Sequence, residues 1–168
     1  MKADLYQTKA YLEKKVLEYE NPHFIENDPI SIPHSFSLKQ DIEISAFWTA
    51  ILAWGNRKTI INKAKELFSL MDYAPYDFCK NHKEKDRRRF ENFKHRTFNY
   101  EDTLYFLEFF QHHFSLNESL ESAFFPNGNS ISVKEVLIHF QQYFFQLPDG
   151  PNRTRKHIST PARKSSCK

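Results

Sequence analysis

The chain has 168 residues, enough for one domain with a core of ordinary size. It contains 17 phenylalanines but only 3 glycines, which excludes the clustered-glycine loops that hold phosphates in nucleotide-binding proteins and kinases. The formal net charge is +3, and neither a membrane-span-length apolar run nor a signal-peptide core is present, so we expect a cytoplasmic protein that does not enter the membrane.

Helical periodicity dominates the sequence and predicts an all-α, bundle-like helical domain over residues 1–147. Residues 4–19 have the pattern of an amphipathic surface helix. Three prolines within residues 21–36 predict an extended connection, because proline disrupts both helices and central strands. Ser37 and Gln40 have the spacing of a capping box, which predicts that a core helix begins there and continues to Trp54.

Turn and cap residues predict the rest of the helices. Gly55 is expected to end the core helix and Asn56 to cap the next one, which runs towards Met71. Pro75 predicts another short helix, and no periodicity remains after Leu147. Caps predict three further helices, at Asn99 with Asp102, at Asn117, and at Ser132 with Glu135.

Positive charge is concentrated in two parts of the sequence. Residues 1–150 contain 18 basic and 21 acidic side chains, whereas residues 151–168 contain 6 basic and no acidic ones. Within the first part, residues 51–100 carry 12 basic and 6 acidic side chains. If folding joins the two basic regions, they form a face suited to a phosphate backbone. The alternative is a solvated surface followed by a disordered tail.

Three short segments combine residue types that bind phosphates. Residues 54–58 place an amide and two cations at a helix N-terminus, residues 94–96 place cations between core phenylalanines, and the tail adds more. Alternatively, Gly55 and Asn56 only turn the chain and His95 is a structural histidine. The candidate nucleic-acid-binding residues are Asn56, Arg57, Lys58, Lys94, His95, Arg96, Arg153, Arg155, Lys156, Lys164 and Lys168.

The sequence predicts no catalytic residue, no metal site and no cofactor. His112 and His113 are adjacent, so on a helix their side chains point about 100° apart and cannot hold one metal ion. Asp41 and Glu43 face different ways for a similar reason. Cys79 and Cys167 match neither a disulfide framework nor a zinc spacing. None of these three residue pairs is therefore predicted to bind a metal ion or to act in catalysis. 

Four short motifs resemble a bacterial family called domain of unknown function 2400, and the resemblance covers essentially the whole chain. That family provides no established activity that could be transferred to this chain. The motifs are Ile30-Ser31-Ile32-Pro33-His34, then Asp41-Ile42-Glu43-Ile44 with Ala53-Trp54-Gly55-Asn56-Arg57, then Lys94-His95-Arg96-Thr97-Phe98-Asn99, and finally Lys156-His157-Ile158-Ser159 with Ser165-Ser166-Cys167-Lys168.

More distantly, the helix ending in Trp54, the turn at Gly55 to Arg57 and residues 60–64 are similar to the opening of the helix-hairpin-helix DNA glycosylase superfamily. That resemblance implies a turn that approaches the DNA minor groove. Those enzymes excise a flipped base with residues placed after a glycine-rich hairpin, which this chain lacks. We therefore expect an incomplete glycosylase-like architecture, the N-terminal portion of a longer protein, in which the basic residues 148–168 lead into a missing helical block.

The leading hypothesis is a nucleic-acid-binding, DNA-repair-like protein with double-stranded DNA as its partner. Its longer relatives would be the glycosylase-like enzymes, while this chain contains no catalytic residue. One alternative is a helical protein-interaction or scaffolding module, in which the basic tail docks on the acidic residues of 101–150. Another is a fragment without a function of its own.

Overall fold

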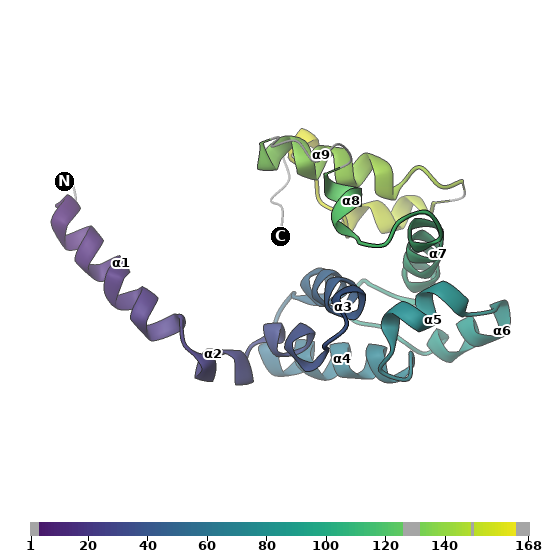
Figure 1. Ribbon diagram of the computed structural model, residues 1–168, viewed down its shortest axis with the longest axis horizontal. Helices are drawn as coiled ribbons and strands as arrows, with labels where there is room; N and C mark the ends of the chain where they lie inside the picture. Colours follow the sequence, from purple (N-terminus) through teal and green to yellow (C-terminus); the bar gives the residue numbers. More distant parts are fainter. Residues whose placement is uncertain (1–3, 126–131, 149, 164–168) are drawn as a thin grey trace.

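The computed structural model describes residues 4–125, 132–148 and 150–163, and within these ranges the chain is all-α, as predicted. A single antiparallel bridge between His95 and Phe98 is the only strand-like pairing in this part of the chain. Figure 1 shows two layers of helices with α7 (Tyr100–Leu116) between them. The lower layer contains α3 (Lys39–Leu52), α4 (Arg57–Ser69), α5 (Pro75–Asn81) and α6 (Glu84–Arg87), and the upper layer contains α8 (Glu121–Phe124) and α9 (Val133–Phe144).

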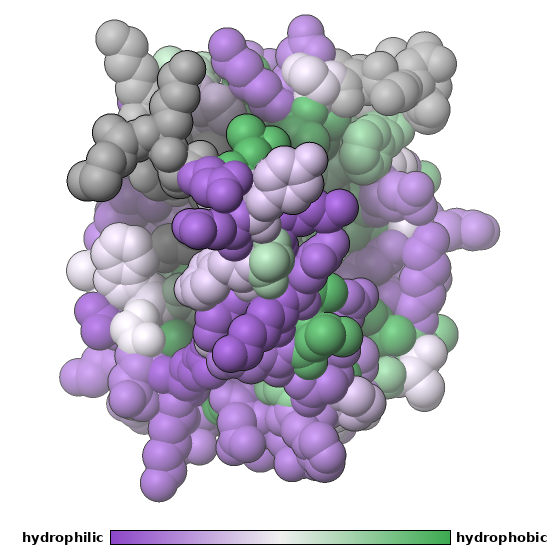
Figure 2. Space-filling view, turned by 90° about the vertical axis from the view of Figure 1, so that its left-hand side faces the viewer, coloured by the Kyte–Doolittle hydropathy of each residue, from purple (hydrophilic) through white to green (hydrophobic). Residues whose placement is uncertain are grey.

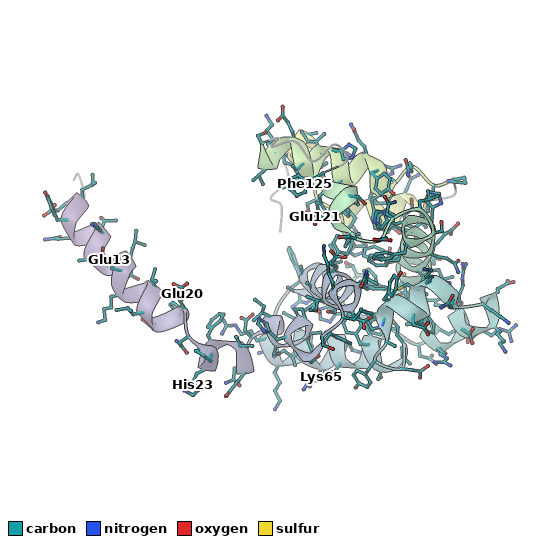
Figure 3. All side chains as sticks on the ribbon, in the orientation of Figure 1. Glu13, Glu20, His23, Lys65, Glu121 and Phe125 are labelled. Carbon is teal, nitrogen blue, oxygen red and sulfur yellow. The ribbon has the colours of Figure 1, made fainter. Side chains whose placement is uncertain are left out.

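The first helix, α1 (Leu5–Tyr19), points away from both layers (Figure 1). Asp4 caps it, because its carboxylate accepts a hydrogen bond from the Tyr6 amide at 3.1 Å. Seen from that end, the molecule presents hydrophobic side chains scattered among more numerous hydrophilic ones (Figure 2). The amphipathic helix is confirmed, yet none of its residues is buried: Figure 3 shows Glu13 and Glu20 well apart from the side chains of the two layers.

The proline-rich residues 21–36 are not an extended connection, and that prediction is wrong. Each proline occupies the first turn of a short helix, where its missing N–H and fixed φ do no harm. Asn21 and Asp28 cap the first two of these helices, and Ile32 is buried. The helices are α2 (Pro22–Glu26), η1 (Pro29–Ser31) and η2 (Pro33–Ser35).

The core helix α3 differs from the prediction at both ends. Leu38 occupies the N-cap position without a side-chain cap, so the predicted capping box at Ser37 does not form. Gln40 instead donates a hydrogen bond from its side-chain Nε2 to the Glu118 carbonyl oxygen at 2.9 Å. The helix ends at Leu52, and Trp54 lies beyond it with 55% of its surface exposed.

The core is built from aromatic rings contributed by both layers. Trp48 of α3 lies 5.4 Å from Phe106 and 5.5 Å from Phe110 of α7, between ring centroids. Phe106 in turn lies 4.9 Å from Phe144 of α9. Each such side chain contributes roughly 1.5–3 kcal/mol when fully buried, so α7 ties the layers together.

Of the three caps predicted after residue 90, two are confirmed, and both are complete capping boxes. Asn99 and Asp102 exchange hydrogen bonds at the start of α7, and Ser132 and Glu135 do so at the start of α9. Asn117 does not begin a helix but ends α7, so that prediction is wrong.

Residues 150–163, here called the C-terminal segment, are ordered despite having no helical periodicity. They include the short 3-10 helices η4 (Asn152–Lys156) and η5 (Pro161–Arg163), which contact α7 and α9. Thr154, Ile158 and Thr160 are buried. The expected disordered tail therefore does not apply to these residues. Across the described ranges, none of the helices has the length and apolarity needed to cross a membrane.

Candidate nucleic-acid interface

The turn between α3 and α4 is the first of the three predicted segments. Gly55 has a φ of +113°, a conformation that other residues rarely adopt. Asn56 caps α4, because its side-chain oxygen accepts from the Thr59 amide at 3.3 Å. The cap is thus confirmed, and it occupies the Asn56 oxygen that we considered for nucleic-acid contact.

The two cations of this turn differ in their surroundings. Arg57 lies 3.6 Å from Asp28 between Nε and Oδ2, and its guanidinium sits 5.6 Å from the centre of the Phe24 ring. Lys58, the next residue of α4, is exposed. Lys58 is therefore the more available of the two for a phosphate.

The second segment packs directly on the first. Arg96 lies so close to Gly55 that a Cβ atom at position 55 would come within 2.8 Å of its Cζ. Arg96 itself has a φ of +55°, which is uncommon for a residue with a side chain. Arg96 lies in the tight turn between His95 and Phe98, whose backbones exchange two hydrogen bonds of 2.9 Å.

His95 lies beneath this surface with only 6% of its area exposed. Burial lowers the pKa of His95 below the ordinary value. Contacts with the carbonyls of Leu52 and Trp54 act in the opposite direction but do not cancel this shift. The lowered pKa favours the neutral ring, which lies beneath the junction between the two segments. This geometry favours the structural interpretation of His95 over direct phosphate binding.

The third segment reaches the second through Arg153. One of its guanidinium nitrogens, Nη2, donates to the Thr97 carbonyl at 3.0 Å, while Nη1 lies 2.9 Å from Asp102 Oδ2 and 3.4 Å from Glu101 Oε2. Nη1 also contacts the Asn99 side chain. Arg153 is thus engaged within the protein, so its predicted contact with nucleic acid stays a prediction.

Asp102 is the buried centre of this connection. Its carboxylate has 0% of its surface exposed, accepts from Thr154 Oγ1 at 2.8 Å and from the Asn99 amide at 3.0 Å, and lies 3.3 Å from His157 Nε2. Burial alone would raise the pKa of Asp102. The contacts with His157, Thr154 and Asn99 together lower it by more, so the net shift is downward. The sequence identified Asp102 only as a helix cap and gave no signal of this second role.

Beside this anchor, the C-terminal segment surrounds a cavity of about 720 Å³. Arg155 stacks over Phe145, with its Cζ atom 4.6 Å from the ring centroid. Arg155 and Lys156 are candidates from the sequence and Arg163 belongs to the basic tail of residues 151–168, whereas Asn152, Ser159 and Thr160 were not predicted. The cavity is lined by Asn152, Arg155, Lys156, Ile158, Ser159, Thr160 and Arg163.

The three segments together form what we call the basic surface. Within the part of the chain that the structure describes, none of its cations except Arg57 and Arg153 has an ion-pair partner. Lys164 and Lys168, also predicted as binding residues, lie outside the described residues. The cations of the basic surface are Arg57, Lys58, Lys94, Arg96, Arg153, Arg155, Lys156 and Arg163.

The same residues offer no centre for metal chemistry. In the described ranges, no three His, Cys, Asp or Glu side chains are grouped so that they could hold a metal ion. Cys79 is buried, and burial raises the pKa of its thiol far above the ordinary value, which favours the neutral thiol over the reactive thiolate. What the described residues of this region bring together is cationic side chains, which as a class pair with anions.

Comparison with known proteins identifies a family. Residues 28–168 match the family described as protein of unknown function (DUF2400), and the chain belongs to it. The match contains the whole basic surface but begins after α1. No curated protein and no solved structure matches the chain significantly.

Proposed function

We propose that this member of the DUF2400 family binds nucleic acid, specifically duplex DNA, through the basic surface. One observation carries the proposal: three basic segments that are far apart in the sequence are joined by direct contacts. Gly55 touches Arg96, and Thr97 accepts a hydrogen bond from Arg153. Basic side chains that only interact with solvent would not require the segments that carry them to be held together by such contacts.

The chemistry of the basic surface suits a polyanion. Lys58, Lys94 and Lys156 are exposed, and each can neutralise a phosphate and release its counterions. The N-terminal amides of α4, a helix of 13 residues, add a positive dipole end next to Lys58. Charge of this kind supports binding to the phosphate backbone without selecting a base sequence.

A DNA-repair role is the more specific part of the proposal. It rests on the likeness of the helix before Trp54, the turn at Gly55 to Arg57 and residues 60–64 to the opening of helix-hairpin-helix glycosylases, in which the corresponding turn approaches DNA. In this proposal the chain supplies binding, whereas base excision depends on residues that the glycosylases place after a glycine-rich hairpin.

Paired substitutions test the binding proposal. We expect Arg57→Ala with Lys58→Ala to weaken binding to a short duplex about tenfold in low salt, because two phosphate contacts are lost. Lys85→Ala with Arg88→Ala is the matched control, since it removes the same charges from exposed positions on α6 and the turn after it. Figure 1 places α6 at the end of the lower layer opposite α2, which Arg57 contacts.

Fluorescence anisotropy with a labelled duplex measures these affinities, and circular dichroism confirms that both variants are folded. Equal weakening by the two double variants would show that only net charge matters. Undiminished binding by the first variant would remove the α3–α4 turn from the interface.

A second candidate function, protein interaction, is favoured by α1. This helix exposes large apolar side chains, among them Leu5 with 84% and Leu17 with 81% of their surface accessible, and buries none of its own residues. Deleting residues 1–20 would abolish partner capture if α1 is the docking element. The same deletion leaves DNA affinity unchanged if the basic surface acts alone.

A further inference from the structure

We infer that the cavity in the C-terminal segment binds a terminal phosphate of a nucleic-acid strand, that is, a phosphomonoester. The inference rests on the proposed function and specifies part of its site. It concerns a different contact from that of the α3–α4 turn, which would meet internal phosphates of a duplex.

The lining of the cavity fits a highly charged anion. Three cations, Arg155, Lys156 and Arg163, border one concave space, and the polar residues Asn152 and Ser159 also line it. The described lining contains no carboxylate that would oppose an anion. Arg guanidinium groups can bind phosphate oxygens in pairs, and the lysine adds a compact charge.

The number of charges favours the end of a strand over its interior. A phosphomonoester carries about −1.5 to −2 charges near pH 7 and presents three strongly accepting oxygens. An internal phosphodiester carries a single negative charge, so three cations around one cavity exceed what it requires. The cavity volume of about 720 Å³ also leaves room for the sugar and base attached to the phosphate.

The cavity is held in shape by contacts on its protein side. Thr154 donates to the buried Asp102 at 2.8 Å, and Ile158 is buried in the core, so the backbone on both sides of Lys156 is fixed. The guanidinium of Arg155 rests on the Phe145 ring at 4.6 Å. A preformed site loses less conformational entropy on binding than a flexible basic tail would.

The cavity also adjoins the rest of the basic surface. Arg153 lies between two lining residues in the sequence, Asn152 and Arg155, and it bonds to the Thr97 carbonyl. Thr97 follows Arg96, which packs on Gly55. A strand whose end occupies the cavity can therefore continue along the segment that carries Lys94 and Arg96.

Isothermal titration with matched ligands tests the inference. The full chain is titrated with one duplex in three forms, carrying 5′-phosphates, 3′-phosphates or only hydroxyl ends, and with a trinucleotide with and without a 5′-phosphate. We expect roughly tenfold tighter binding of at least one phosphorylated form, as charge-assisted hydrogen bonds to the extra oxygens predict. Lys156→Ala with Arg163→Ala should reduce this ratio to about one.

Two control variants separate this site from the binding proposed above. Arg57→Ala with Lys58→Ala should weaken all three duplexes alike and leave the ratio between them unchanged, and Arg88→Ala should change neither quantity. Equal affinity for phosphorylated and unphosphorylated ligands overturns the inference, whatever the duplex affinity. Discrimination between the trinucleotides without any duplex binding supports the cavity and overturns the proposed function instead.

Inorganic phosphate provides the last comparison. If it displaces the phosphorylated trinucleotide at equal concentration, the cavity takes free phosphate, and its assignment to a strand end is wrong. If the trinucleotide binds much more tightly, the attached nucleosides contribute and the assignment holds.

Discussion

The two ends of the described chain differ both in regular secondary structure and in burial, and the end with the more regular structure is the less buried one. At one end, α1 is a regular, capped helix of 15 residues, yet it buries none of them. At the other end, the C-terminal segment has only short 3-10 turns, yet Thr154, Ile158 and Thr160 are buried. Regular local structure and attachment to the core are therefore separate properties in this protein.

The difference has a physical cause. Periodicity and a capping aspartate are sufficient to form α1, because helix hydrogen bonds are local. The C-terminal segment instead depends on one buried carboxylate, Asp102, and on partners 51 or more residues away in the sequence. We therefore expect substitutions at this anchor to have large effects and changes in α1 to have small ones.

The largest expected effect comes from Asp102→Asn. The substitution removes the negative charge that pairs with Arg153 and puts an NH2 donor in place of one of the two accepting oxygens, so the free energy of unfolding should fall by about 3 kcal/mol. Glu101→Gln is the matched control: Glu101 also pairs with Arg153 but is exposed, and its loss should cost less than about 1 kcal/mol. Urea unfolding measures both, and similar losses would show that Asp102 is not the anchor.

Acidification should produce an intermediate effect that also originates in the core. Burial lowers the pKa of His82, His95 and His113. As the pH falls through their ordinary value near 6.5, the unfolded chain takes up protons that the folded protein does not. The free energy of unfolding should therefore decrease between about pH 7 and pH 5.

Asp102 does not contribute over that pH range, because its lowered pKa gives stability that is lost only as the pH falls below its ordinary value of 3.8. His113, held by Tyr143 and by the Ser119 carbonyl, provides the check. The variant His113→Gln should show a smaller decrease between pH 7 and pH 5. An undiminished pH dependence would exclude His113 as a contributor.

The smallest expected effect comes from deleting residues 1–20. Because α1 contributes no buried residue, the cooperative unfolding of the rest of the chain should change by less than about 0.5 kcal/mol. Thermal unfolding of the shortened chain measures this. A loss comparable to that of Asp102→Asn would mean that α1 packs on the two layers in solution.

The sequence predicts much of the helical architecture. Periodic apolar residues identify α3, α4, α7 and α9, and two capping boxes locate the starts of α7 and α9 correctly. The failures have local causes that sequence patterns do not resolve. Prolines 22, 29 and 33 can break a helix or begin one, and only the fold decides between these outcomes.

The candidate site is predicted in pieces but not as a whole. Charge and turn chemistry identify residues 56–58, 94–96 and 153–156 separately. Their contacts depend on tertiary structure, since nothing in the sequence indicates that Arg96 lies on Gly55 or that Arg155 stacks on Phe145. Ser159 and Thr160 become site residues only because the C-terminal segment folds around a cavity, whereas Arg163 already belongs to the basic tail that the sequence predicts to bind phosphate.

The salt dependence of duplex binding tests the central claim most directly, because its slope reports the number of phosphates that the protein neutralises. Lys58→Ala, Lys94→Ala and Lys156→Ala each remove one exposed cation from a different segment of the basic surface. Each should reduce the magnitude of the slope by about one, and the triple variant by about three, whereas Lys85→Ala should leave it unchanged. A triple variant with the wild-type slope would contradict a single basic surface that binds DNA.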